Sequence, residues 1–287
     1  MTAAFALATS LLWGLADFGG GLLTRRIPAL TVVVVSQGAA ALVLGTIVVA
    51  TGAWSEIGPR LWFAVGAGVV GTIAMLCFYQ ALARGPMGVV SPLATLAVGV
   101  PVGVALLLGE RPAVLQVAGI TIAVAGVMLA GGPHLRGAPV QRRTILLTLV
   151  AAAGFGAVMA LIAEASTTAT GLFLALFVQR LLNIGVGGVA LYVAVRRGSA
   201  ALPTGGTSVI RRAIPALTFV GLADVAANAT YVVAAQHGPV TVAAVLASLY
   251  PVVTALAARG LLDERLRIVQ TVGAGLALSG SMLLAAG

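Results

Sequence analysis

One segment of this sequence occurs twice. It reads ERPAVLQVAGITIAVAGVML at residues 110–129 and ERLRIVQTVGAGLALSGSML at residues 264–283, and eight residues recur at the same steps 154 positions apart. Each copy is mostly apolar and about as long as the ~20 residues that a helix needs to cross a bilayer. The repetition predicts that the chain consists of two related halves.

The composition indicates a membrane protein. Of the 287 residues, 60% are hydrophobic and only 8% are charged, whereas about a quarter of the residues in a soluble domain are charged. The net charge of +9 is carried by arginines that stand singly or in short clusters between apolar runs. This placement is typical of membrane loops and argues against nucleic acid as a partner. Cys77 is the single cysteine, so an intrachain disulfide and a cysteine metal site are excluded, and we expect neither a metal nor a cofactor.

Ten apolar runs are long enough to span the membrane. We expect an all-α integral membrane protein with ten transmembrane helices, a multi-pass protein of the cell (cytoplasmic) membrane with no soluble domain. The predicted spans are 3–23, 29–51, 61–83, 88–108, 112–130, 144–163, 171–195, 213–235, 240–261 and 266–286.

The two halves are expected to be inverted repeats. We place the first five-helix repeat at residues 1–131, a connecting loop at 132–143 and the second repeat at 144–287. Because five is odd, the second repeat must enter the membrane from the opposite side. Thirteen arginines lie in the odd-numbered loops and two in the even-numbered ones, so the positive-inside rule predicts cytoplasmic odd loops and both termini outside.

We interpret the duplicated segment as having a structural role. Glu110 and Glu264 fall at predicted helix starts, where a carboxylate favours the helix dipole. Small residues spaced at i, i+4 and i+7 then predict a face for close helix contact in each copy. These residues are Gly119, Ala123 and Gly126 in the first copy and Gly273, Ala277 and Gly280 in the second.

The sequence resembles the drug/metabolite transporter superfamily, in particular its EamA-like ten-helix family. The resemblance is carried by LLWGLADF (11–18), by the two repeats at 109–127 and 262–281, and by PVVTALAARGLLDE (251–264). It implies a carrier that moves small metabolites, often outward, through a central cavity shared by the halves. It also implies cytoplasmic termini, opposite to the arginine count. The chain departs from symmetry in having Ala97 where the second half has Pro251.

Three charges lie well inside predicted spans: Asp17, Arg180 and Asp224. Each costs about 2.5 to 3.5 kcal/mol at a helix centre, so such residues are expected to face a bundle interior or a wet cavity. We expect an aspartate to bind a cationic group or a proton, with Arg180 as counter-ion or as an anchor for an anionic group; the alternative is a salt bridge that only fixes packing. Further binding candidates are Trp13, Gln37, Tyr79, Ser91, Thr95, Asn183, Asn228, Tyr231, Ser248 and Tyr250, and the gating candidates are Pro92, Pro101 and Pro251.

These features together predict a secondary transporter. We expect it to export small metabolites, amino acids, amines or drugs by alternating access, with protons as a candidate coupling ion and the lipid bilayer as its environment. Both a monomer and a homodimer are compatible with ten helices. The alternatives are a membrane-embedded enzyme acting on lipid-linked substrates, for which no acid–histidine or metal set is present, and a channel or scaffold. The chain contains no phosphate-binding loop for ATP and is not expected to be an enzyme.

Overall fold

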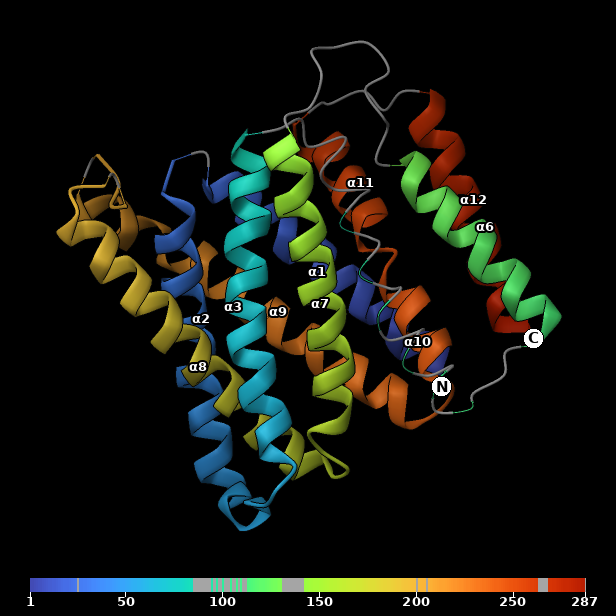
Figure 1. Ribbon diagram of the computed structural model, residues 1–287, viewed down its shortest axis with the longest axis horizontal. Coiled ribbons are helices and arrows are strands. Elements are labelled where there is room, and N and C mark those ends of the chain that lie inside the picture. Colours follow the sequence, from blue (N-terminus) through green and yellow to red (C-terminus); the bar gives the residue numbers. More distant parts are fainter. Residues whose placement is uncertain are drawn as a thin grey trace.

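The protein is a helical bundle in a computed structural model that describes residues 1–24, 26–84, 113–130, 142–199, 201–204, 206–262 and 268–286, with isolated residues between 94 and 109. Within these ranges every secondary-structure element is a helix. Figure 1 shows the arrangement. The helices are α1 (Thr2–Thr24), α2 (Ala29–Thr51), the 3-10 helix η1 (Ala53–Glu56), α3 (Leu61–Arg84), α6 (Val114–Ala130), α7 (Arg142–Glu164), α8 (Ala169–Arg196), α9 (Thr207–Gln236), α10 (Val240–Ala247), α11 (Tyr250–Leu262) and α12 (Ile268–Ala286).

Six of these helices are long and apolar enough to cross a membrane: α1, α2, α3, α7, α8 and α9. They coincide with predicted spans to within a few residues, except that α9 begins six residues before the predicted start at 213. α6 and α12 are shorter apolar helices at the predicted fifth and tenth spans. The predicted span 88–108 lies almost wholly outside the described residues. The protein is therefore a multi-pass membrane protein.

The predicted span 240–261 consists of two helices that meet close to the gating candidate Pro251. α10 ends at Ala247, and α11 begins at Tyr250 after a two-residue turn. Pro251 stands in the first turn of α11, where its missing N–H group costs least, whereas in a continuous helix it would clash with the preceding turn. The Ser248 hydroxyl donates to the Val245 carbonyl at 2.7 Å, so it satisfies a carbonyl group in the last turn of α10.

Each half packs mainly against the other half. α1 packs on α9 and α3 packs on α7, while α2 lies against α8 and α6 against α12. These are matching pairs, because α1 corresponds to α7 and α3 to α9 when the repeats are aligned. The contacts that hold the bundle together thus come in pairs that the repeat relates to each other. Figure 1 shows one member of such a pair, the neighbours α3 and α7.

Contacts along the helices show that the repeats are inverted. Thr9 bonds Thr230 at 2.9 Å and Trp13 bonds Asp224 at 3.1 Å, so α1 and α9 run in opposite directions. α2 and α8 are likewise antiparallel, since Gln37 meets Arg180 while Val34, earlier in α2, meets Gly187, later in α8.

The α3–α7 pair follows the same rule. Gly66 faces Leu161, and Gly154 faces Ala74, so these two helices are also antiparallel. The pairs α1–α9, α2–α8 and α3–α7 that join the two halves are therefore all antiparallel, as repeats inverted across the membrane require.

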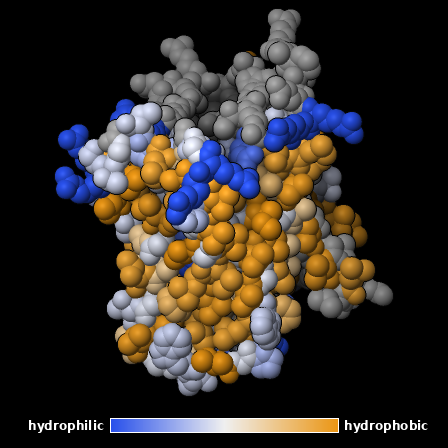
Figure 2. Space-filling view, turned by 60° about the vertical axis from the view of Figure 1, so that its left-hand side comes forward, coloured by the Kyte–Doolittle hydropathy of each residue, from blue (hydrophilic) through white to orange (hydrophobic). Residues whose placement is uncertain are grey.

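The arginine-rich loops gather at one end of the bundle. Thr31 donates to the Ala201 carbonyl and Ile27 packs with Leu217, which brings the loops after α1 and after α8 together. Arg60 is at the other end, where it bonds the Glu164 carbonyl at 3.1 Å. Figure 2 shows hydrophilic side chains around one end, above a broad apolar surface. The arginines at the first end are Arg26, Arg142, Arg143, Arg196, Arg197, Arg211 and Arg212.

The two copies of the duplicated segment form an interface between α6 and α12. Gly119, Ala123 and Gly126 are buried on α6, a helix whose other faces are largely exposed. A Cβ added at Gly280 of α12 would overlap the backbone nitrogen of Ala123 and lie 2.8 Å from the Gly119 carbonyl oxygen. The small residues allow backbone-to-backbone contact, and so the two copies of the segment pack on each other. Glu110 and Glu264 lie outside the described residues.

Candidate functional site

A charged pair lies where the two halves meet. Arg180 of α8 and Asp224 of α9 form a salt bridge with 2.8 Å between Nη1 and Oδ2. Only 2% of the arginine side chain and 20% of the aspartate side chain are exposed. Arg180 Nη1 also donates to Gln37 Oε1 of α2 at 2.7 Å. The first half therefore contributes directly to a charge pair that belongs to the second half.

The Asp224 carboxylate receives three further donors. Trp13 Nε1 donates to Oδ1 at 3.1 Å, and Gln37 Nε2 donates to Oδ2 at 3.3 Å. Asn228, one turn further along α9, donates from Nδ2 to Oδ1 at 3.3 Å and to the Asp224 carbonyl at 2.8 Å. The carboxylate is thus held from three helices besides its own: α1, α2 and α8.

Small residues let these helices approach closely enough to build the centre. Gly221 lies one turn before Asp224, and a Cβ there would overlap the Ser36 carbonyl of α2. At Gly68 of α3, a Cβ would lie 2.6 Å from the Leu182 Cβ of α8. The Thr72 hydroxyl of α3 forms a hydrogen bond with the side-chain amide of Asn183 at 3.1 Å. The polar centre is therefore located by backbone contacts that only glycine permits.

The charged pair forms part of the wall of a cavity of about 100 Å³. This is room for a few water molecules or a small organic molecule. The wall is built from α1, α2, α3, α7, α8, α9 and α11 and from Ala97, so it draws on both halves. Its polar members are Trp13, Asp17, Gln37, Tyr79, Gln179, Arg180, Asn183, Asp224, Asn228 and Tyr250.

Asp17 is the second carboxylate in the cavity wall. It follows Trp13 by one turn of α1 and is partly buried. Among the described residues it forms no hydrogen bond or ion pair, although it interacts electrostatically with Asp224 and with the hydroxyls of Tyr79 and Tyr250. Gly20 leaves room for the Tyr79 hydroxyl, because a Cβ there would lie 2.8 Å from it. The cavity thus holds two carboxylates and one guanidinium.

The structure brings most of the predicted site residues together. Those that line the cavity are Trp13, Asp17, Gln37, Tyr79, Arg180, Asn183, Asp224, Asn228 and Tyr250. Their role in binding a cargo stays a prediction. Ser91, Thr95, Pro92 and Pro101 lie outside the described residues, and Pro251 lies at the break between α10 and α11.

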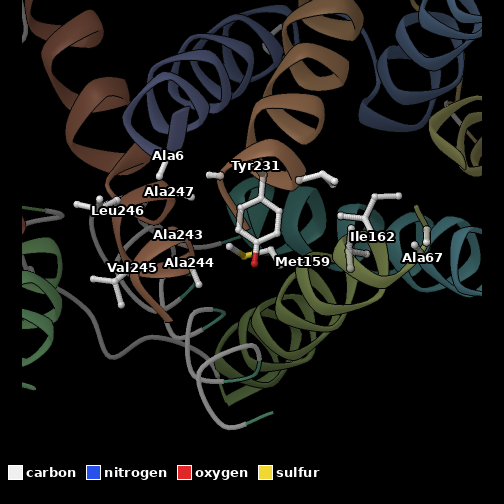
Figure 3. Close-up of a cluster of buried hydrophobic side chains, with 14 of the residues drawn as sticks. Ala6, Ala67, Met159, Ile162, Tyr231, Ala243, Ala244, Val245, Leu246 and Ala247 are labelled. Atoms are coloured by element: carbon white, nitrogen blue, oxygen red, sulfur yellow. The ribbon is translucent and has the colours of Figure 1, made fainter. Parts of the chain in front are cut away.

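Two candidates lie away from the cavity wall. Tyr231 is fully buried in an apolar cluster, where Figure 3 shows its ring among side chains that include Met159 and Ala244. Its ring centroid is 6.1 Å from that of Trp13, so it supports the cavity wall from behind. Ser248 is buried at the end of α10 and bonds within that helix.

Sequence reasoning missed several wall residues that carry no charge. Phe155 and Met159 of α7 line the cavity and are the repeat counterparts of Trp13 and Asp17, 142 positions earlier. Gln179 also lines it. The repeat alignment was the signal that could have found them, because an inward position in one half has an inward counterpart in the other.

Comparisons with known proteins agree with this architecture. A family model described as "EamA-like transporter family" matches residues 1–132 and again 142–286. A solved structure titled only "Crystal structure of protein" is similar with a TM-score of 0.72 at 17% identity, covering 99% of this chain and 97% of that one, which supports the fold alone. The search of curated proteins gave no match. Since the family model covers nearly the whole chain as two repeats, the chain belongs to the EamA-like transporter family.

Proposed function

We propose that this protein is a secondary transporter that exports small metabolites, amino acids, amines or drugs across the cell membrane by alternating access. The observation that carries the proposal is the charged centre itself. Arg180, Asp224 and Asp17 border one cavity between inverted halves. Ionisable groups in transmembrane helices are costly and usually mark a substrate or ion pathway.

The inverted arrangement supports alternating access. Transporters built from inverted repeats bind their cargo at the repeat interface and expose it alternately by moving one bundle against the other. Here the cavity wall includes helices of both halves, and the interrupted pair α10–α11 borders it through Tyr250. A discontinuous helix is a common element of such sites.

Proton coupling forms part of the proposal. Two carboxylates face one guanidinium in the cavity, so the site has one negative charge that a proton could neutralise. Carboxylates of this kind act as proton relays in other membrane transporters. An inward proton gradient would then drive the outward movement of cargo.

Flux measurements in proteoliposomes test the proposal. With a pH gradient imposed across the vesicle, a carrier shows saturable uptake and counterflow, and Asp17→Asn or Asp224→Asn should reduce the response to the gradient. Ser279→Ala provides a matched control, because Ser279 is exposed on α12 and its hydroxyl bonds only within its own helix. Flux without saturation or counterflow would indicate a channel, and equal flux in all variants would contradict the assigned site.

A further inference from the structure

The Asp224 carboxylate is already saturated. Its Oδ2 accepts from Arg180 at 2.8 Å and from Gln37 at 3.3 Å. Its Oδ1 accepts from Trp13 at 3.1 Å and from Asn228 at 3.3 Å. A carboxylate offers about four acceptor positions. A cargo could therefore reach Asp224 only by displacing one of these donors.

Asp17 is in the opposite condition. Its carboxylate faces the same cavity and forms no hydrogen bond or ion pair to any residue that the structure describes. The charged and titratable groups that face it from neighbouring helices are Asp224 of α9, Arg180 of α8, Tyr79 of α3 and Tyr250 of α11. The described wall residues of α2 and α7 contribute none.

Charge balance then defines the ligand. When both carboxylates are ionised, Asp17 and Asp224 contribute two negative charges and Arg180 one positive charge, which leaves the cavity with one excess negative charge. An unpaired charge away from bulk water is strongly unfavourable. In the absence of a bound proton, a ligand of net charge +1 neutralises the cavity, whereas a zwitterion leaves the excess charge in place.

Unsatisfied amide oxygens also favour a donor. Gln179 Oε1 and Asn228 Oδ1 have no hydrogen-bond partner among the described residues, and their side chains belong to residues only 2% and 3% exposed. Both residues line the cavity. Arg180 Nε and Nη2 likewise lack a described acceptor, which suits a water molecule or a neutral oxygen. Two unpaired amide oxygens on wall residues, together with a free carboxylate in the same wall, match the N–H groups of an ammonium ion.

Aromatic rings complete the wall. Trp13 and Tyr250 pack edge to face with their centroids 6.2 Å apart, and Phe78 and Phe155 do so at 5.6 Å. All four residues line the cavity with Tyr79. An organic cation gains from the faces of such rings, and its apolar part gains from their burial.

We propose that Asp17 binds the cationic group of the cargo, and that this cargo is a small primary ammonium ion of net charge +1. The inference rests on the proposed transport function and specifies its substrate class. The salt bridge between Arg180 and Asp224 remains formed when the ligand binds. The pair acts as a positioning element that holds Trp13 and Asn228 around the bound ammonium group.

Binding of benzylamine to purified protein in nanodiscs tests the proposal without any transport. With Trp54 and Trp62 replaced by phenylalanine, fluorescence reports on Trp13, which lies in the cavity wall. Benzylamine should change the Trp13 fluorescence saturably. Asp17→Asn should raise the Kd for benzylamine at least about tenfold, whereas Asp17→Glu should retain most of the affinity. Benzyl alcohol, which is neutral, should bind the parent protein and Asp17→Asn equally.

Several outcomes would overturn the proposal. These are the absence of benzylamine binding to the parent protein, binding to Asp17→Asn within about twofold of the parent, and tighter binding of L-phenylalanine than of benzylamine, which would assign recognition to Arg180. A thermal melt confirms that each variant is folded, and Asp17→Glu provides the charge-preserving rescue. Asp17-dependent binding without flux in proteoliposomes would refute the transport function alone, and flux without such binding would refute this inference alone.

Discussion

Removing one partner of the buried ion pair should affect stability unequally. Asp224→Ala leaves the Arg180 guanidinium, which is 2% exposed, without a counter-ion. Arg180→Met instead leaves Asp224, which is 20% exposed and keeps its donors Trp13, Gln37 and Asn228. The difference in burial, and in the hydrogen bonds that survive, sets the order of the two effects.

The expected magnitudes follow from that difference. An uncompensated buried charge costs about 3 to 5 kcal/mol, which we assign to Asp224→Ala. Arg180→Met should cost less, about 1.5 to 3 kcal/mol, because it removes one charge-assisted bond from a carboxylate that still has three donors. The double variant should be more stable than the sum of the single effects implies, by about 2 kcal/mol, since it leaves neither charge unpaired.

Equilibrium unfolding in mixed detergent and SDS micelles, followed by tryptophan fluorescence, measures all four free energies of unfolding. Ser279→Ala is the control for substitution at an exposed helical position. If Asp224→Ala destabilises the protein no more than Arg180→Met, or if the two effects simply add, then Asp224 is not the counter-ion on which the buried Arg180 guanidinium depends.

Three further results are expected. Gly280→Leu should separate α6 from α12 and lower the melting temperature, because even a Cβ at Gly280 overlaps the α6 backbone, whereas Gly275→Leu, with nothing within 4 Å, should have little effect in the same melt. In a cysteine-free background, a membrane-impermeant thiol reagent should label Ser199→Cys and Ser55→Cys from opposite sides of the membrane; labelling from one side would contradict the inverted repeats. Arg60→Ala should change the free energy of unfolding by at most about 1 kcal/mol, since its salt bridge to Glu164 joins side chains that are 54% and 57% exposed.

The polar centre shows how far the repeat can be used as a guide. The fold obeys the two-fold relation closely, because helix pairs such as α1–α9 and α3–α7 bury equivalent surfaces. The charges do not obey it, since Met159 occupies the position equivalent to Asp17. Each half therefore supplies different chemistry to a shared framework, and a single cavity can present a carboxylate on one side and apolar contacts on the other.

The class of protein, its two inverted halves and its buried charges could be predicted from the chain alone. Apolar length, loop arginines and the cost of ions in lipid act locally, so they leave a direct record in the order of residues. The same reasoning correctly chose small residues such as Gly119 and Gly280 as contact points.

Only the tertiary structure decided which polar groups meet. The pairing of Arg180 with Asp224 depends on how three helices from both halves cross, and so does the absence of a described partner for Asp17. It also decided that Tyr231 supports the wall from behind while Tyr79, its repeat counterpart, borders the cavity. Helix periodicity fixes which side chains share a face, but the rotation of that face toward a neighbour depends on packing across the whole bundle.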